Sequence, residues 1–122
     1  MPWQPKKEQA RMISEHFQRS EFACKCGCGF DTVDYSLLEI LEDVRWHFNK
    51  PVTVNSGCRC PNYNLIIGGS TGSQHMFGRA ADITVKDTKP SEVQGFLADH
   101  DGGLGSYDTF THIDTRGYLS RW

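Results

Sequence analysis

An aspartate stands in the middle of an otherwise apolar segment, and this residue limits the folds that the chain can adopt. Residues 80–85 read Ala-Ala-Asp-Ile-Thr-Val, which is typical of a strand. Alternation of side chains puts Ala80, Asp82 and Thr84 on one face. A carboxylate within an apolar strand is costly unless it is paired or bound to a metal. Ala80 is small, so this face has room for an ion beside Asp82.

A second alternating segment, residues 110–114, carries His112 in its centre. If the two strands pair, Asp82 and His112 project from neighbouring positions, and the loop before the first strand delivers His75. Two imidazoles and one carboxylate with an open fourth position are the catalytic form of zinc coordination. Zinc in such a site lowers the pKa of water towards ~7 and polarises a carbonyl.

Most of the remaining chain divides into short helices and strands. Residues 36–49 have apolar side chains at helical spacing, and Ser36 forms a capping box with Glu39. The other expected elements are a helix at 6–19, a strand at 52–54, a short helix between Pro61 and Gly68, a helix at 90–100 and a strand at 104–107. This order predicts an α+β fold, with residues 1–122 forming one small domain whose helices pack on a mainly antiparallel sheet.

Composition and charge exclude several classes of protein. The formal net charge of the 122 residues is -2, which gives no basis for nucleic-acid binding. The apolar runs are too short for a membrane-spanning helix, and the N-terminus lacks the apolar core of a signal peptide. We therefore expect a monomer that is made in the cytoplasm, binds no membrane, and reaches any target outside the cell through release by another protein.

Five cysteines occur in two groups, one at 24–28 and one at 58–60. Their odd number excludes complete disulfide pairing within one chain. Without an export signal, reduced thiols or a structural metal are favoured over disulfides. Three readings stay open: free thiols, a second and structural zinc ion at Cys24, Cys26, Cys28 and Cys60, or a disulfide between the two groups.

The histidine and aspartate motifs resemble a known family. The pattern Ser-x-His-x-x-Gly-x-Ala-x-Asp at 73–82, followed by His-x-Asp at 112–114, is similar to the zinc D-alanyl-D-alanine carboxypeptidase family, which also includes L-alanyl-D-glutamate endopeptidases. The hedgehog signalling domain shares that family's fold and zinc site. The segment 54–64 resembles the family's arginine element, with Cys58 in place of the usual tyrosine. The resemblance covers the chain from about residue 20 to its end.

The resemblance implies a role for each matching residue. It makes His75, Asp82 and His112 the ligands of one catalytic zinc ion. Arg59 matches an arginine that contacts the substrate near the scissile carbonyl or a terminal carboxylate, for which its planar fork is suited. Ser73 matches a serine that hydrogen-bonds the substrate, although a serine in this position also serves to cap a loop.

The general base is the position where the sequence departs from the family. Many relatives have an acidic residue three positions before the second histidine ligand, where this chain has Thr109. The candidates are Asp108, one residue earlier, and Asp114, which shares a strand face with His112. We favour Asp114 as the base, with the alternative that it orients a histidine.

The resemblance implies a zinc-dependent hydrolase of peptidoglycan stem peptides. The bond cut would be a D-Ala-D-Ala end or an internal L-Ala-D-Glu bond, in phage or prophage lysis or in cell-wall turnover. The alternative is a catalytically inactive, zinc-containing binding module for cell wall or protein, as the hedgehog domain illustrates.

Overall fold

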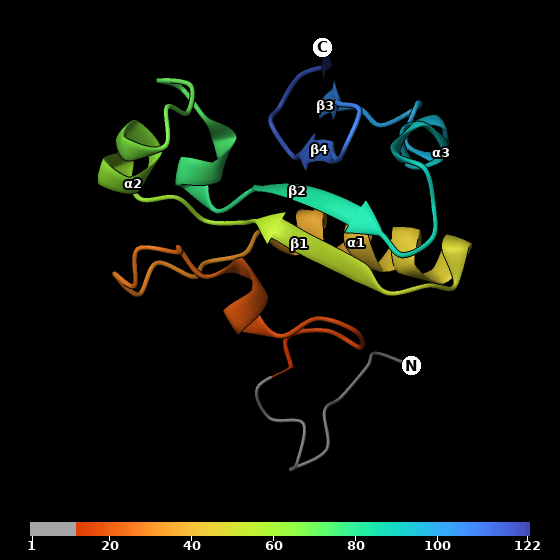
Figure 1. Ribbon diagram of the computed structural model, residues 1–122, viewed down its shortest axis with the longest axis horizontal. Helices are drawn as coiled ribbons and strands as arrows, with labels where there is room; N and C mark the ends of the chain where they lie inside the picture. Colours follow the sequence, from red (N-terminus) through yellow and green to blue (C-terminus); the bar gives the residue numbers. More distant parts are fainter. Residues whose placement is uncertain (1–11) are drawn as a thin grey trace.

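The computed structural model describes residues 12–122, which form the expected α+β fold (Figure 1). Five strands make one sheet in the order β1-β2-β4-β3-β5. All neighbouring strands are antiparallel except β3 and β5. The strands are β1 (Val52–Ser56), β2 (Ala80–Val85), β3 (Gly103–Ser106), β4 (Thr111–Asp114) and β5 (Ser120–Arg121), and the α-helices are α1 (Tyr35–Phe48), α2 (Pro61–Ile66) and α3 (Pro90–Phe96).

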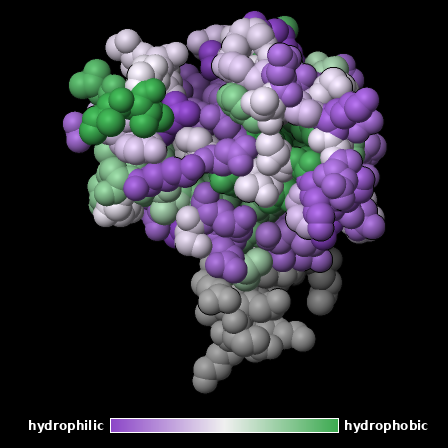
Figure 2. Space-filling view, viewed as in Figure 1, coloured by the Kyte–Doolittle hydropathy of each residue, from purple (hydrophilic) through white to green (hydrophobic). Residues whose placement is uncertain are grey.

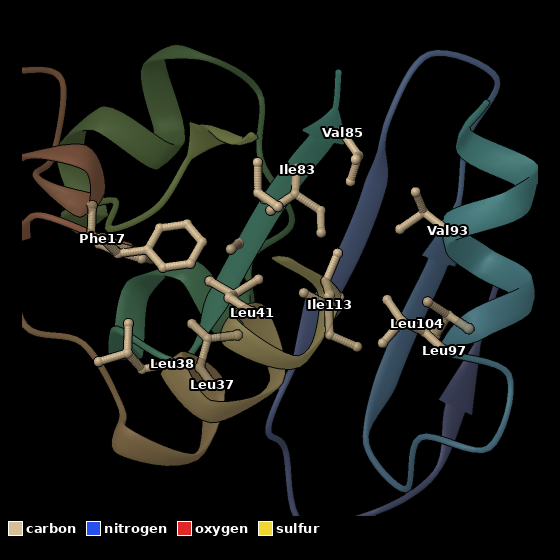
Figure 3. Packing of buried hydrophobic residues seen from close by; sticks show 14 residues of the cluster. Phe17, Leu37, Leu38, Leu41, Ile83, Val85, Val93, Leu97, Leu104 and Ile113 are labelled. Carbon is tan, nitrogen blue, oxygen red and sulfur yellow. The ribbon is translucent and has the colours of Figure 1, made fainter. Parts of the chain in front are cut away.

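One face of the sheet forms the hydrophobic core against α1 and α3 (Figure 3). Alternation along β2 directs Ala81, Ile83 and Val85 to this face. Leu41 of α1 and Ile113 of β4 are fully buried there. The opposite face of the same strands therefore carries the polar residues, including Asp82 and His112.

The N-terminal part of the chain differs from the prediction. A helix was expected at 6–19; residues 6–11 lie outside the described part, residues 12–18 form a turn closed by a bridge between Met12 and Gln18, and Arg19 begins the 3-10 helix η2 (Arg19–Phe22). Glu42 of α1 accepts hydrogen bonds from the Ser14 hydroxyl (2.5 Å) and the His16 backbone N–H (2.8 Å). These distant contacts satisfy polar groups that an α-helix would otherwise pair internally, so tertiary structure overrides a weak helix propensity.

Other elements also differ from the prediction. The helix α1 begins at Tyr35 with Asp34 as its N-cap, so Ser36 lies inside the helix and the expected capping box is wrong. The helix α3 ends at Phe96 rather than at residue 100. The two-residue strand β5 was not predicted, because it is too short to produce an alternating pattern.

A small apolar surface lies over α2. Leu65, Ile66 and Ile67 are all exposed, and hydrophobic atoms gather at the edge of the molecule where Figure 1 draws α2 (Figure 2). Among residues 12–122, no helix has the length and apolarity needed to cross a membrane.

Candidate metal centre

Three ligand-type side chains converge on the polar face of the sheet. Asp82 of β2 lies directly opposite His112 of β4 in the register of the two strands, as the sequence predicts. His75 comes from η3 (Gln74–Phe77), the 3-10 helix before β2. Oδ1 of Asp82 lies 3.2 Å from Nε2 of His75 and 2.9 Å from Nδ1 of His112. One ligand atom from each of the three buried residues lies within 4.8 Å of the others.

In each histidine, one ring nitrogen faces Asp82 and the other faces away from it; we call these the inner and the outer nitrogen. The outer nitrogen of each histidine is held by a separate partner. Nδ1 of His75 lies 2.7 Å from the carbonyl oxygen of Gly57. Nε2 of His112 lies 2.7 Å from Oδ2 of Asp114. A hydrogen bond from the outer nitrogen fixes the ring and leaves the inner nitrogen available as a ligand, an arrangement common around metal-binding histidines. Two oriented imidazoles and a carboxylate are a donor set that fits zinc and leaves a coordination position open.

The charges at the centre are strongly coupled. Burial raises the pKa of Asp82, but hydrogen bonds from His112 and His75 lower it more, so the pKa of this carboxyl lies below its usual range. Burial lowers the pKa of His112, but its hydrogen bonds to Asp114 and Asp82 outweigh that effect and raise the pKa above its usual value. His112 thus lies between two carboxylates, Asp82 and Asp114, which favour the protonated form of its ring.

The raised pKa of His112 predicts that metal affinity falls with decreasing pH. Nδ1 of His112 must lose its proton before it can bind a metal, and a raised pKa means that protons compete with the metal up to a higher pH than at an ordinary histidine. We expect the apparent zinc affinity of this centre to fall about tenfold per pH unit for each proton displaced. Zinc titrations followed by the His112 imidazole NMR signals, between about pH 6 and 8, measure this dependence; an affinity independent of pH would contradict it.

Asp114 lies behind His112 and is completely buried. Its carboxylate accepts hydrogen bonds from the backbone N–H of Gly103 (3.1 Å) and from Nε (2.9 Å) and Nη2 (2.7 Å) of Arg116. Burial raises the pKa of Asp114, but the hydrogen bonds from His112 and Arg116 lower it below its usual range. A Cβ at position 103 would overlap the carboxylate, so a glycine is required there. This environment favours an orienting role over that of a base.

Arg59 and Ser73 both lie beside the centre. Nη2 of Arg59 lies 3.1 Å from Oδ2 of Asp82, and Nε donates to the Ser56 hydroxyl at 3.1 Å. Ser73 is the N-cap of η3, where its Oγ accepts a hydrogen bond from the His75 backbone N–H (3.3 Å). Ser73 therefore caps the turn that carries His75 and also borders the cavity described next.

A cavity of about 480 Å³ opens over the three ligand-type residues. Arg59 and Ser73 line it, together with three residues that the sequence did not identify as functional: Tyr107, Arg116 and Trp122. The sequence offered one indication that Arg116 is functional, namely its position shortly after the His-x-Asp motif. Asp108 is exposed and lies outside the lining. Within residues 12–122, Asp82 is the single carboxylate that lines the cavity.

Comparison with known proteins agrees with this geometry. The family described as Peptidase M15 matches residues 15–114. A curated relative, the zinc D-Ala-D-Ala carboxypeptidase of Streptomyces albus G, is 49% identical over 35 residues. That segment is 29% of this chain but 14% of the relative, so the similarity spans a small part of the length of that protein.

Proposed function

The chain belongs to the peptidase M15 family, and we propose that it is a zinc-dependent hydrolase of peptidoglycan stem peptides. The observation that carries the proposal is the convergence of His75, Asp82 and His112 at the floor of an open cavity. The bond we propose is either the terminal D-Ala-D-Ala bond or the internal L-Ala-D-Glu bond. The name of the Streptomyces relative, a zinc D-Ala-D-Ala carboxypeptidase, supports the first.

In this proposal His75, Asp82 and His112 would hold the zinc ion, the histidines through the ring nitrogens that face Asp82. A zinc ion supplies Lewis-acid chemistry, because it acidifies water and polarises a peptide carbonyl. Gly57 and Asp114 hold the outer nitrogens of the two histidines. The chain thereby keeps both rings in the tautomer and orientation that binding requires.

Two arginines make the cavity suited to an anionic peptide. The guanidinium groups of Arg59 and Arg116 both line it. Guanidinium groups bind carboxylates through paired hydrogen bonds and stabilise the negative charge that develops on a carbonyl oxygen under attack. Stem peptides carry such carboxylates, one at the C-terminus of D-Ala-D-Ala and one on the D-Glu residue. We propose that Arg59, beside Asp82, contacts the group nearest the scissile bond.

Digestion of purified peptidoglycan tests the proposed function. The zinc-loaded protein should release stem-peptide fragments, and a metal chelator should stop the release. Mass spectrometry of the fragments, beside synthetic pentapeptide and muramyl-peptide substrates, identifies the bond that is cut. A zinc-loaded protein that is inert on all of these substrates would refute the hydrolase.

Replacing Arg59 by alanine should slow hydrolysis while the zinc stays bound. Removing one preorganised donor of this type costs about 10²–10³-fold in rate, and Arg59 is not one of the three ligand-type residues. Arg59→Lys keeps the charge but loses the fork, so it should recover only part of the rate. Arg19→Ala, an equal charge change on an exposed residue, is the control. The measurements are initial rates and zinc content; an unchanged rate in Arg59→Ala would remove Arg59 from the reaction.

A second candidate function is a binding module that keeps the zinc but does not hydrolyse. The observation in its favour is that, among the described residues, Asp82 is the single carboxylate lining the cavity and Thr109 stands where many relatives have an acid. Sedimentation of the protein with insoluble peptidoglycan, without release of fragments, would favour this function. A role in lysis after release by another protein stays a prediction.

A further inference from the structure

A second group of metal-binding side chains lies outside the cavity. Cys24, Cys26, Cys28 and Cys60, here called the cysteine cluster, have sulfur atoms that all lie within 4.8 Å of one another. The Sγ atoms of Cys24 and Cys26 are 3.4 Å apart, and those of Cys26 and Cys60 are 3.6 Å apart. Sulfurs bound at about 2.3 Å to a tetrahedral zinc lie about 3.8 Å from one another. The cluster therefore has nearly the dimensions of a four-thiolate zinc site.

Two glycines allow three closely spaced cysteines to face one point. The Cys-x-Cys spacing is unfavourable for tetrahedral binding in an extended chain, but Gly27 and Gly29 both have positive φ, 83° and 93°. The backbone N–H of Cys24 donates to the carbonyl of Phe30 (2.8 Å), which closes the loop of residues 24–30. A side chain at either glycine would meet no neighbouring atom, so backbone conformation rather than space explains the glycines.

Backbone N–H groups point at the sulfurs of the cluster. The N–H of Cys60 lies 3.4 Å from Sγ of Cys24, and the N–H of Tyr63 lies 3.4 Å from Sγ of Cys60. Hydrogen bonds from N–H groups stabilise a thiolate, the form in which cysteine binds metal. The fifth cysteine, Cys58, is different: it is buried, and its thiol donates to the carbonyl of Thr32 at 2.9 Å. Cys58 is therefore a packing residue outside the cluster.

We propose that the cysteine cluster binds a second zinc ion with a structural role. Four thiolates form a closed coordination shell, which is the form of structural rather than catalytic zinc sites. The ion would clamp the loop of residues 24–30 to Cys60, the neighbour of Arg59 in the chain. The same short segment contains Gly57, whose carbonyl holds Nδ1 of His75. Binding at the cluster thus fixes the backbone that positions two groups of the cavity.

A disulfide is the competing reading, and the geometry disfavours it. The sulfur separations of 3.4 and 3.6 Å in the structure exceed the disulfide bond length of about 2.05 Å. A disulfide would also use two of the four sulfurs and leave the other two beside it. Four mutually close sulfurs are what a single ion requires.

Metal counting on reduced protein tests the proposal independently of any activity. Protein purified with zinc and a non-thiol reductant should contain two zinc ions per chain by elemental analysis. Cys60→Ser should lose one ion and His75→Ala should lose the other, so the failure of one site is distinguishable from the failure of the other. Cys58→Ser, which keeps a hydroxyl donor for the Thr32 carbonyl, is the matched control and should retain both ions.

Two further measurements guard against a variant that does not fold. Cys28 is exposed on the loop, so Cys28→Ser should remain folded, lose the same ion and unfold at a lower temperature than the wild type. Cobalt-substituted wild type should show sulfur-to-cobalt charge-transfer absorption, which Cys28→Ser should lose and His75→Ala should keep. A reduced wild type that holds only the ion lost in His75→Ala would overturn the proposal, as would a disulfide among these cysteines in protein prepared without oxidant.

Discussion

Replacing His75 by alanine is expected to empty the proposed zinc centre and to lower the proposed peptidoglycan hydrolysis by about 10³-fold or more. His75 supplies one of three converging ligand atoms, and its buried ring is held by Gly57 at Nδ1 and by Asp82 at Nε2. Two remaining ligands hold zinc weakly, and loss of the ion removes several kcal/mol of transition-state stabilisation. Zinc content by elemental analysis and the rate of fragment release should fall together.

A histidine elsewhere in the fold provides the matched control for this experiment. His47 lies on the exposed side of α1, where its ring stacks on Phe96 at a centroid distance of 4.1 Å. His47→Ala should keep the wild-type zinc content and rate. If His75→Ala retained full zinc and full activity, His75 would not be a ligand and the proposed centre would be wrong.

The candidate metal centre could be predicted in large part because the facing of Asp82 and His112 follows from strand alternation. An aspartate within an apolar strand required a partner, and the alternating segment 110–114 offered His112 on a face of its own strand. The structure confirms the pairing, with Asp82 opposite His112 in register. Local sequence thus determined both the faces and the type of element for this part of the fold.

The surroundings of the centre depend on contacts that no local pattern reports. Arg116 lines the cavity from the loop after β4, and Trp122 lines it from the end of β5, a strand that pairs with β3 over only two residues. A side chain at position 105 of β3 would overlap Trp122, so this position requires a glycine. The turn at 12–18 depends in the same way on Glu42, which lies 26 residues beyond His16 in the chain. The periodicity of apolar residues indicates which face of a helix or strand is buried. It does not indicate which distant side chain fills the space opposite a glycine.

The hydrogen bonds of Asp114 distinguish a residue that orients His112 from a general base. Oδ2 of Asp114 accepts from His112 and Arg116, and Oδ1 accepts from Gly103 and Arg116, so every neighbour of the carboxylate is an N–H donor. In Asp114→Asn, one carboxylate oxygen becomes an amide NH₂ group. Whichever oxygen is replaced, the NH₂ group then faces an N–H donor. If the NH₂ faces His112, Nε2 must become the acceptor and the proton moves to Nδ1. The inner nitrogen is then protonated and cannot bind the metal.

We therefore expect Asp114→Asn to act mainly on metal affinity. Loss of a partner that orients a ligand typically costs about 10–100-fold in affinity or activity, and saturating zinc should restore most of the rate because the ion displaces the proton from Nδ1. A general base would behave differently, since its removal costs about 10²–10⁴-fold even when the metal is fully bound. Activity is measured against free zinc, with bound zinc determined in the same samples. A large loss of rate at full occupancy would make Asp114 the base.

Asp108→Asn is the matched variant, because it makes the same change at an exposed carboxylate outside the cavity. It should leave both zinc affinity and rate at the wild-type level. If Asp108→Asn instead lost rate at full zinc occupancy, the segment between Tyr107 and Phe110 would have to move in the substrate complex and bring Asp108 to the reacting water. The two variants together thus decide between an orienting Asp114, a catalytic Asp114 and a catalytic Asp108, since each role gives a different combination of zinc content and rate.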